Sequence, residues 1–474
     1  MPEGWAAVTV RSLFELKYGK ALKEEVRKGG DVAVFGSNGI VGSHNVPLGK
    51  GPVVLIGRKG SVGAVHLHTG SFWAIDTTYF LDDFRGLDPR YVAFAFRYAD
   101  LSKLESSSAI PGLSRELIYD ESLLIPPLAE QKRIVAKVEE LLASVNAARE
   151  RLARVPAILK RFRQAVLGAA CDGRLTAEWR EAHPNRQIEV SLNALAPRLD
   201  SRPRRGVPES VDTPEVIDSL ELPESWGAFS VAQLLRLGAL LDVKDGNHGA
   251  NHPKVADFTA AGLPFITAAQ VRGFQIDYDG AYKVSGKPLE KLRVGFARPG
   301  DAILTHKGSV GRSALNDREC VLTPQTTYYR PDVQIINPGY LVFLFAAPQF
   351  YSQLAQVMSQ TTRDFVPIRE QYRLFLILPP KDEQDEIFRR VEALFKLADA
   401  IEKRVAAATA RSDKVMQAIL AKAFRGELVP TEADLARGEG RGYESAGALL
   451  ERLSPGREHM GEASKRTLVD KGHA

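Results

Sequence analysis

Two short segments carry residue types that can hold a phosphate group. GRKGSVG spans residues 57–63 and THKGSVG spans residues 305–311, so the order Lys-Gly-Ser-Val-Gly recurs at an offset of 248. Such a turn offers an ammonium group, a hydroxyl and backbone N–H groups, which together can bind a phosphate oxygen. The alternative is a tight turn whose glycines only supply positive φ, and the repetition does not separate these two interpretations.

A second repeated pair, IDTTYF (75–80) and PQTTYY (324–329), is offset by 249. The loops around these pairs differ, and they are rich in Lys, Arg, Asn, Gln and His, which are donors and acceptors suited to reading base edges. These loops are KYGKALKEEVRKGG (17–30), SNGIVGSHN (37–45), DVKDGNHGANHPK (242–254) and TAAQVRGFQIDY (267–278). Different loops on a shared scaffold suit two different targets, although each loop alone is also compatible with an ordinary solvated loop.

Signatures of catalysis and of metal binding are missing from the sequence. No GxGxxG follows a strand pattern and no GxxxxGK[ST] occurs. IPPL (125–128) and LPPK (378–381) lack the polar first residue and the aromatic last residue of the amino-methyltransferase motif. HLH (66–68) has no clustered cysteine or carboxylate partner, and DGNHGANH (245–252) is interpreted as a polar loop. We therefore expect no catalytic residue, no metal site and no cofactor in this chain.

A long helix with a regular series of apolar residues, here called a ladder, is the element that must position these segments. From Ile134 to Ala169, apolar residues follow steps of four and three over five heptads, which is typical of a coiled-coil helix. Adding 253 gives a second ladder from Ile387 to Lys422, weaker at Ser412 and Lys422, and the two can pair within one chain. The expected seam residues are Ile134, Val138, Leu141, Val145, Leu152, Ile387, Val391, Leu394, Ile401 and Val405. Pro156 lies inside the first ladder, where we expect a kink or a local break.

The chain consists of one sequence module that occurs twice. PEGW (2–5) matches PESW (223–226), and LLIPPLAEQKRI (123–134) matches LILPPKDEQDEI (376–387). AACDGRLTA (169–177) likewise matches AFRGELVP (423–430). The expected parts are a first mixed α/β module at 1–122, a central helix at 123–181, a mobile linker at 182–221, a second mixed module at 222–375, a C-terminal helix at 376–435 and a flexible tail at 436–474.

Composition bounds the protein class. The chain has 474 residues, 44% hydrophobic and 26% charged, which fits a globular protein of several domains. The net charge of +5 fits a polyanionic partner but does not prove one. Two cysteines, Cys171 and Cys320, argue against a disulfide scaffold. No signal peptide or membrane-length apolar run is evident, so we expect a cytoplasmic protein.

The proline-pair-to-EQ helix starts and the doubled layout together resemble the specificity subunit of type I restriction–modification systems. The resemblance covers residues 1–435 and implies an α+β fold. In that fold, two target-recognition domains are separated by two long antiparallel helices that form an intramolecular coiled coil. Two such modules on antiparallel helices are related by a pseudo-two-fold axis. Because the modules differ, the halves of the DNA site should differ too.

The resemblance also implies partners and roles. Each recognition domain reads one half of a bipartite site in double-stranded DNA, and two methyltransferase subunits dock on the helices. S-adenosylmethionine belongs to those subunits, whereas ATP and Mg belong to a restriction subunit where one is present. Matching positions predict phosphate contacts at Lys59, Ser61, Lys307 and Ser309. Residue type and loop context predict base contacts at Lys17, Tyr18, Lys20, Ser37, Asn38, Asn247, His248, Gln325 and Arg363.

Two rival functions stay open at this point. One is an enzyme, either a fused restriction–methylation protein or a stand-alone nuclease, which would need the missing motifs within this chain. The other is a coiled-coil adaptor that binds no DNA and therefore shows no salt-dependent DNA affinity.

Overall fold

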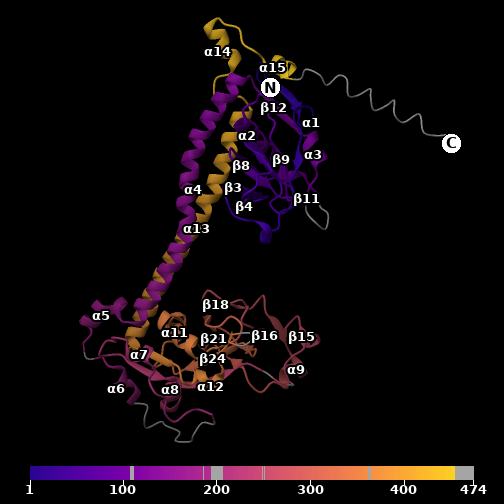
Figure 1. Ribbon diagram of the computed structural model, residues 1–474. Coiled ribbons are helices and arrows are strands. Elements are labelled where there is room, and N and C mark those ends of the chain that lie inside the picture. The colour runs from indigo at the N-terminus through magenta and orange to yellow at the C-terminus, as the bar shows by residue number, and fades with distance from the viewer. Residues whose placement is uncertain are drawn as a thin grey trace, which may run out of the picture. The chain divides into compact units, whose positions relative to one another are not determined.

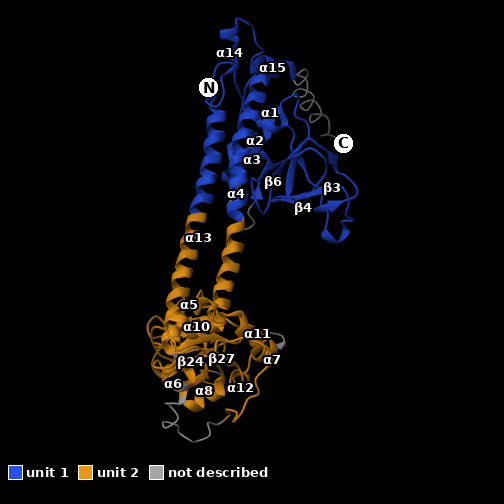
Figure 2. Cartoon of the chain, turned by 90° about the vertical axis from the view of Figure 1, so that its left-hand side faces the viewer, with its two compact units in different colours: residues 1–153, 406–474 blue, residues 154–405 orange. Residues whose placement is uncertain are grey.

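The computed structural model describes residues 1–106, 112–184, 186–193, 206–247, 249, 251–360 and 364–453. The chain divides into two compact units (Figure 2). The first unit comprises residues 1–153 and 406–474, and the second comprises residues 154–405. Each unit therefore holds one mixed module together with one part of each of two long helices, and the units are described separately below.

The first module contains two four-stranded sheets, ordered β2-β9-β6-β7 and β4-β3-β8-β5, and a β1-β12 pair (Figure 1). Its strands are β1 (Ala6–Thr9), β2 (Lys17–Tyr18), β3 (Val32–Gly36), β4 (Gly39–His44), β5 (Gly49–Lys50), β6 (Val53–Gly57), β7 (Val65–His68), β8 (Ser71–Ala74), β9 (Thr78–Leu81), β10 (Glu105–Ser106), β11 (Gly112–Leu113) and β12 (Ser122–Ile125). Its helices are α1 (Val10–Leu13), α2 (Pro89–Ala99) and α3 (Arg115–Asp120). Residues 91–96 of α2 are buried, as their apolar run predicts.

The second module repeats this topology in the sheets β14-β24-β21-β22 and β15-β19-β16-β23-β20 and in the β13-β27 pair. Its strands are β13 (Gly227–Ser230), β14 (Leu240–Asp245), β15 (Phe258–Thr259), β16 (Leu263–Ile266), β17 (Val271–Arg272), β18 (Gln275–Ile276), β19 (Tyr282–Val284), β20 (Phe296–Ala297), β21 (Ala302–Thr305), β22 (Ser313–Leu315), β23 (Cys320–Leu322), β24 (Thr326–Pro331), β25 (Ser359–Gln360), β26 (Asp364–Phe365) and β27 (Phe375–Leu378). Its helices are α8 (Val231–Leu237), α9 (Gly286–Glu290), α10 (Pro338–Ala346), α11 (Pro348–Val357) and α12 (Ile368–Gln371).

The duplication extends to strand direction. In each module one pair of central strands is parallel, β3 with β8 and β16 with β23, whereas the flanking pairs are antiparallel. The second module adds β15 at the sheet edge and the β17-β18 hairpin. The two modules therefore share one framework, and the second carries insertions.

Two helices of 44 residues each, α4 (Leu128–Cys171) and α13 (Lys381–Phe424), match the predicted ladders. Each begins directly after its proline pair, because proline fits the first turn of a helix but not its interior. Gly173, just after α4, and Gly426, just after α13, both have positive φ, which is typical of the residue that ends a helix. Helix α4 runs through Pro156 without interruption, so the expected local break is absent.

Within each unit the two long helices lie side by side, and their contacts run in opposite directions along the chain (Figure 2). In the first unit Arg149 pairs with Asp413 at 3.1 Å, and in the second unit Arg163 pairs with Asp399 at 2.6 Å. The predicted seam residues are buried or half-buried in both units: Ile134, Val138, Leu141, Val145 and Leu152 in the first, and Ile387, Val391, Leu394, Ile401 and Val405 in the second.

The C-terminal end of the second ladder follows the predicted positions only in part. Val415 is 42% exposed and Lys422 is exposed, whereas Met416 is half-buried and Leu420 and Ala423 are buried. At Val415 and Lys422 the buried position therefore shifts by one residue, to Met416 and Ala423, whereas Ile419 stays half-buried as predicted. The shift keeps the Lys422 ammonium in water, where burial would have cost a large desolvation penalty.

A buried carboxylate ties the start of α4 to the first module. Glu130 accepts hydrogen bonds from the Trp5 indole N–H at 2.9 Å and from the Glu432 backbone N–H at 2.8 Å. Burial raises the pKa of Glu130. The neighbouring Gln131 donates to the Pro126 carbonyl and accepts from the backbone N–H of Asp88, the residue that caps α2. The EQ dipeptide thus joins the helix start to the N-terminal segment and to α2.

The same arrangement occurs in the second unit. Glu383 accepts from the Trp226 indole N–H at 2.9 Å and also pairs with Arg180 at 2.7 Å. Gln384 donates to the Pro379 carbonyl and accepts from the backbone N–H of Asn337, which caps α10. The repeated motifs PExW and EQ, far apart in sequence, are therefore two sides of one buried contact.

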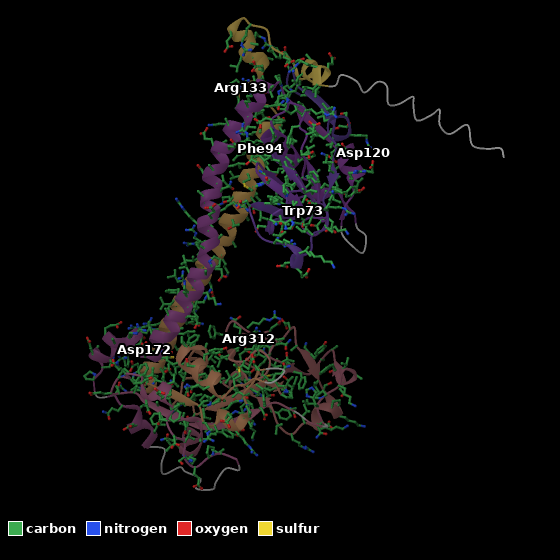
Figure 3. All side chains as sticks on the ribbon, in the orientation of Figure 1. Trp73, Phe94, Asp120, Arg133, Asp172 and Arg312 are labelled. Atoms are coloured by element: carbon green, nitrogen blue, oxygen red, sulfur yellow. The ribbon has the colours of Figure 1, made fainter. Side chains whose placement is uncertain are left out.

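The segments that follow the long helices close these contacts. In the first unit Pro2 lies against Gly426, and in the second unit Pro223 lies against Gly173. A Cβ on either glycine would come within 2.5 Å of the proline ring. Arg133, at the start of α4 in Figure 3, pairs with Glu432 at 2.7 Å. Each module thus contacts the start of the helix that follows it and the end of the other long helix.

Parts of the expected linker and tail are structured. Four further helices are α5 (Ala177–Ala182), α6 (Ile188–Asn193) and α7 (Glu215–Asp218) in the second unit, with α14 (Glu432–Glu439) in the first. The segment expected to be a flexible tail contains the helix α15 (Ala446–Leu453), in which Ala446 and Leu449 are buried in the core of the first unit. Ile188 of α6 and Ile217 of α7 are likewise buried in the core of the second unit. Apolar residues spaced at one helical turn explain why these segments pack.

In the described part of the chain, none of the helices combines the length and the apolar character that crossing a bilayer requires.

The seam can be tested by placing charge on it. Replacing Val138 and Leu141 together with Asp should lower the free energy of unfolding by about 3 kcal/mol or more, because the carboxylates would be buried without partners. Replacing the exposed Ala136 and Ala143 of the same helix with Asp is the matched control and should change stability little. Thermal unfolding measures both, and equal midpoints for the two variants would contradict the seam.

Candidate nucleic-acid interface

The GRKGSVG segment forms the turn between β6 and β7. Gly57 N–H donates to the Ala64 carbonyl at 2.8 Å, and Gly63 N–H donates back to the Gly57 carbonyl at 2.9 Å. Gly60, at the centre, has φ of +79°. Lys59 and Ser61 are exposed. The sequence at this turn therefore fixes the backbone while the cation and the hydroxyl remain accessible.

The THKGSVG segment forms the same turn between β21 and β22. Thr305 N–H donates to the Arg312 carbonyl at 2.8 Å, and Gly311 N–H donates to the Thr305 carbonyl at 2.9 Å. Lys307 is exposed, and its Nζ lies 5.5 Å from the ring centre of Phe365. Ser309 is half-buried, and its carbonyl accepts from the Thr305 hydroxyl. Arg312, labelled in Figure 3, follows this turn.

Backbone hydrogen bonds correct the alignment of the neighbouring strands. Arg58 N–H donates to the Thr77 carbonyl, and His306 N–H donates to the Gln325 carbonyl. Thr77 therefore corresponds to Gln325, an offset of 248, and the predicted offset of 249 for IDTTYF and PQTTYY is one residue too large. The error came from aligning the two TT dipeptides with each other, whereas only Thr78 and Thr326 occupy the same backbone position.

A glycine beside each turn is required by the close approach of two backbones. A Cβ on Gly19 would lie 2.0 Å from the Ile75 carbonyl oxygen, and one on Gly246 would lie 2.1 Å from the Thr323 carbonyl oxygen. Gly19 and Gly246 are therefore equivalent positions. It follows that Tyr18 corresponds to Asp245 and that Lys20 corresponds to Asn247.

The structure gathers several predicted residues of the first module. Ser61 N–H donates to the Ser37 hydroxyl at 3.3 Å, so the β3–β4 turn that carries Ser37 and the exposed Asn38 lies against the phosphate-type turn. Lys20 is exposed, and its carbonyl accepts from the indole of Trp73, labelled in Figure 3. Lys17 differs from the others because its ammonium pairs with Asp82 at 2.7 Å.

The predicted residues of the second module are less accessible than those of the first, where the structure describes them. Asn247 is 3% exposed, and its amide donates to the Val294 carbonyl, so it supports a loop and cannot reach a base in this conformation. Gln325 is half-buried and accepts from the Ala268 N–H at 3.1 Å. His248 and Arg363 lie outside the described residues. The burial of Asn247 argues against the predicted base contact, and residue type alone does not reveal burial.

Sequence reasoning missed an alternating stack of tyrosines and arginines in the first module. The guanidinium carbon of Arg58 lies 5.4 Å from the ring centre of Tyr18, and that of Arg115 lies 4.9 Å from the same centre. Arg58 also lies 5.8 Å from the ring centre of Tyr79, whose ring meets Tyr18 edge to face at 5.1 Å, and Arg115 also lies 5.6 Å from that of Tyr119. Arg58 lies inside the GRKGSVG motif, so its neighbour Lys59 was a signal for it. Nothing in the sequence indicated Arg115.

At the position of Arg58 the second module has a buried histidine. His306 is 1% exposed, and its Nδ1 lies 2.7 Å from the Thr327 hydroxyl. Burial lowers the pKa of His306 to about 4. The imidazole is therefore neutral at neutral pH, and this turn carries only the positive charge of Lys307.

Other reactive groups are engaged in the fold. His66 contacts the Ser37 carbonyl and His68 contacts the Ser71 carbonyl. No cluster of three or more histidine, cysteine, aspartate or glutamate residues suited to a metal ion occurs among the residues that the structure describes. Burial raises the pKa of the Cys320 thiol to about 12, so this thiol stays protonated.

Comparisons with known proteins converge on one family. The family described as type I restriction modification DNA specificity domain matches residues 2–156. The Escherichia coli EcoBI specificity subunit is 32% identical over 362 residues, which cover 75% of this chain and 69% of that protein. The Escherichia coli EcoDI specificity subunit is 29% identical over 476 residues, which cover 97% of each chain.

A solved structure shares the fold. It comes from work on complex assembly and conformational transition of the type I R-M system, and it superposes with a TM-score of 0.58 over 90% of this chain and 99% of that chain. Its sequence identity is 17%, so the likeness concerns the fold alone.

The histidine of the second turn should make stability depend on pH. Because the pKa of His306 is about 4 in the folded chain and about 6.5 when unfolded, the unfolded state binds more protons below pH 6.5. Stability is therefore lost as pH falls from 6.5 towards 4, by about 2 kcal/mol at pH 5. Urea unfolding of the protein and of His306→Asn at pH 7 and pH 5 measures this. A pH dependence of the same size in both proteins would refute it.

Proposed function

This chain belongs to the specificity subunits of type I restriction–modification systems, and we propose that each of its two modules reads one half of a bipartite, asymmetric DNA site. As a member of that family it supplies DNA sequence specificity and is itself non-catalytic. The observation that carries the proposal is the duplicated framework with different side chains at equivalent places.

The shared framework suits contacts to phosphate, and the side chains that differ between the modules suit contacts to bases. Lys59 and Lys307 occur at the same place in the same turn, where they can contact phosphate whatever the base sequence. Tyr18 and Arg58, by contrast, differ from the residues at the equivalent positions of the second module, which are Asp245 and His306. Two readers that share phosphate contacts but differ beside them suit two different half-sites.

The long helices suit a spacer between the readers. Each has 44 residues, about 66 Å at 1.5 Å per residue, which exceeds the ~34 Å of one DNA turn. We infer that α4 and α13 pair as an antiparallel coiled coil, set the distance between half-sites and offer the docking surface for two methyltransferase subunits. S-adenosylmethionine would be bound by those subunits, and ATP and Mg by a restriction subunit where present.

Methylation mapping tests this proposal directly. The chain is co-expressed with a type I methyltransferase subunit with which it assembles, and methylated adenines are located by genome sequencing. The expected result is one split motif with two unlike halves. Exchanging residues 1–122 for the corresponding module of a relative should change one half only, and a change in both halves would disprove modular reading.

The shared lysines should act through phosphate. Replacing Lys59 and Lys307 with Ala should weaken DNA binding by the complex for every sequence. It should also lower the slope of log affinity against log salt by about 2, since each released phosphate contact contributes about 0.9. Arg90→Ala is a suitable control, because Arg90 pairs with Asp88 and Glu139 near the start of α2. An unchanged slope in the double variant, measured by titration at several salt concentrations, would exclude these contacts.

A further inference from the structure

Two arginines of the first module are fixed on one tyrosine ring without a neutralising acid. Arg58 and Arg115 both lie within 5.5 Å of the ring centre of Tyr18. In the part of the chain that the structure describes, no ion pair joins either one to a carboxylate. Arg11 belongs to the same stack through Tyr119 but differs, because it pairs with Glu116 and Asp120 at 2.9 and 3.0 Å.

The hydrogen-bonding capacity of these two arginines is largely unused. Arg58 donates from Nη1 to the Asp76 carbonyl at 3.3 Å, and Arg115 donates from Nη1 to the Leu16 carbonyl at 3.4 Å. Both bonds are at the long end of the ordinary range. The buried Nε of Arg115 has no hydrogen-bond partner. Because that Nε is buried, a ligand can meet only Nη1 and Nη2 of Arg115. These two groups carry four N–H donors in each guanidinium, and one of the four is used, so a planar fork of donors remains for a ligand.

The position of the pair places it beside the phosphate-type turn. Arg58 directly precedes Lys59, and Leu113 N–H donates to the Arg58 carbonyl at 2.9 Å, which brings the start of α3 to the same place. Arg115 is the first residue of α3. Two like charges close to one ring repel each other, and a polyanion bound at the turn would relieve that repulsion.

The second module lacks this pair on the same framework. Val366 N–H donates to the His306 carbonyl at 2.9 Å, as Leu113 does to Arg58, so Ile368 at the start of α12 corresponds to Arg115. The three positions are thus Tyr, Arg and Arg in the first module, and Asp, a neutral His and Ile in the second. The two modules therefore differ in both charge and hydrogen-bonding capacity at these positions.

We propose that Arg58 and Arg115, clamped by Tyr18, are specificity-determining residues that read a guanine in the half-site of the first module. Guanine presents the two acceptors O6 and N7 in the major groove, and the arginine fork matches them with two hydrogen bonds. Stacking on Tyr18 orients the forks before binding, which reduces the entropy lost on contact. Lys59 and Ser61 hold the adjacent phosphate and fix the register.

This inference rests on the proposed function, and methylation mapping separates the two. If the unaltered complex methylates no split motif, the proposed function fails. If the motif is split but the half assigned to residues 1–122 contains no G·C pair, the function stands and the guanine reading is overturned. The expected result is a split motif with a G·C pair in that half.

Substitutions then test the clamp itself. Arg58→Lys and Arg115→Lys keep the charge but lose the fork, so at least one should relax the motif at a single position of that half. The preference for guanine there should fall roughly 10- to 100-fold. Tyr18→Ala should weaken the preference for guanine at the same position. Tyr18→Phe should retain that preference, because it keeps the ring. Arg11→Lys is the matched control and should leave the motif unchanged.

Two outcomes would overturn the proposal. One is an unchanged motif in both arginine variants at unchanged methylation rate. The other is a uniform loss of methylation with no change in the motif, which would make the arginines phosphate contacts. The variants Arg58→Lys, Arg115→Lys and Tyr18→Phe change little of the packing. The test therefore does not depend on whether Tyr18→Ala folds.

Discussion

A buried indole-to-carboxylate hydrogen bond is the contact on which both halves of this protein depend. Trp5 donates to Glu130 in the first unit, and Trp226 donates to Glu383 in the second, each at 2.9 Å. Neither carboxylate is solvent-exposed, so each needs these donors to offset its desolvation. The glutamine next to each glutamate bonds the capping residue of α2 or α10. In each unit the Glu-Gln dipeptide therefore fixes the orientation of the mixed module on the long helix that follows it.

This contact also explains why the reading residues are free to differ. Orientation is fixed at the helix start, and the framework of the turn is fixed by backbone hydrogen bonds and by Gly19 or Gly246. Tyr18, Arg58 and Arg115 can therefore be replaced by Asp245, His306 and Ile368 while the strands keep their order. Under the proposed function, substitution at such positions would alter what is read and would leave the support intact.

Sequence reasoning found the repeated parts because repetition and heptad spacing are local patterns. The structure places the predicted seam residues in buried or half-buried positions, and the matched PExW and EQ motifs meet. It did not foresee what long-range packing decides: the exposure of Val415 and Lys422, the burial of Asn247 and the helices α6 and α14. Arg115 was missed because its importance comes from Tyr18, which is distant in sequence.

The division of the chain has a consequence for its synthesis. The second unit is continuous, whereas the core of the first unit includes Phe424, Ala446 and Leu449 from the far end of the chain. The backbone N–H of Ala446 even donates to the carbonyl of Gly4. As the ribosome works from the N-terminus, the second unit has all of its residues before these three are translated. The first module is therefore made first but completes its core last, and the apolar residues that pack against Phe424, Ala446 and Leu449 stay uncovered until those three are made.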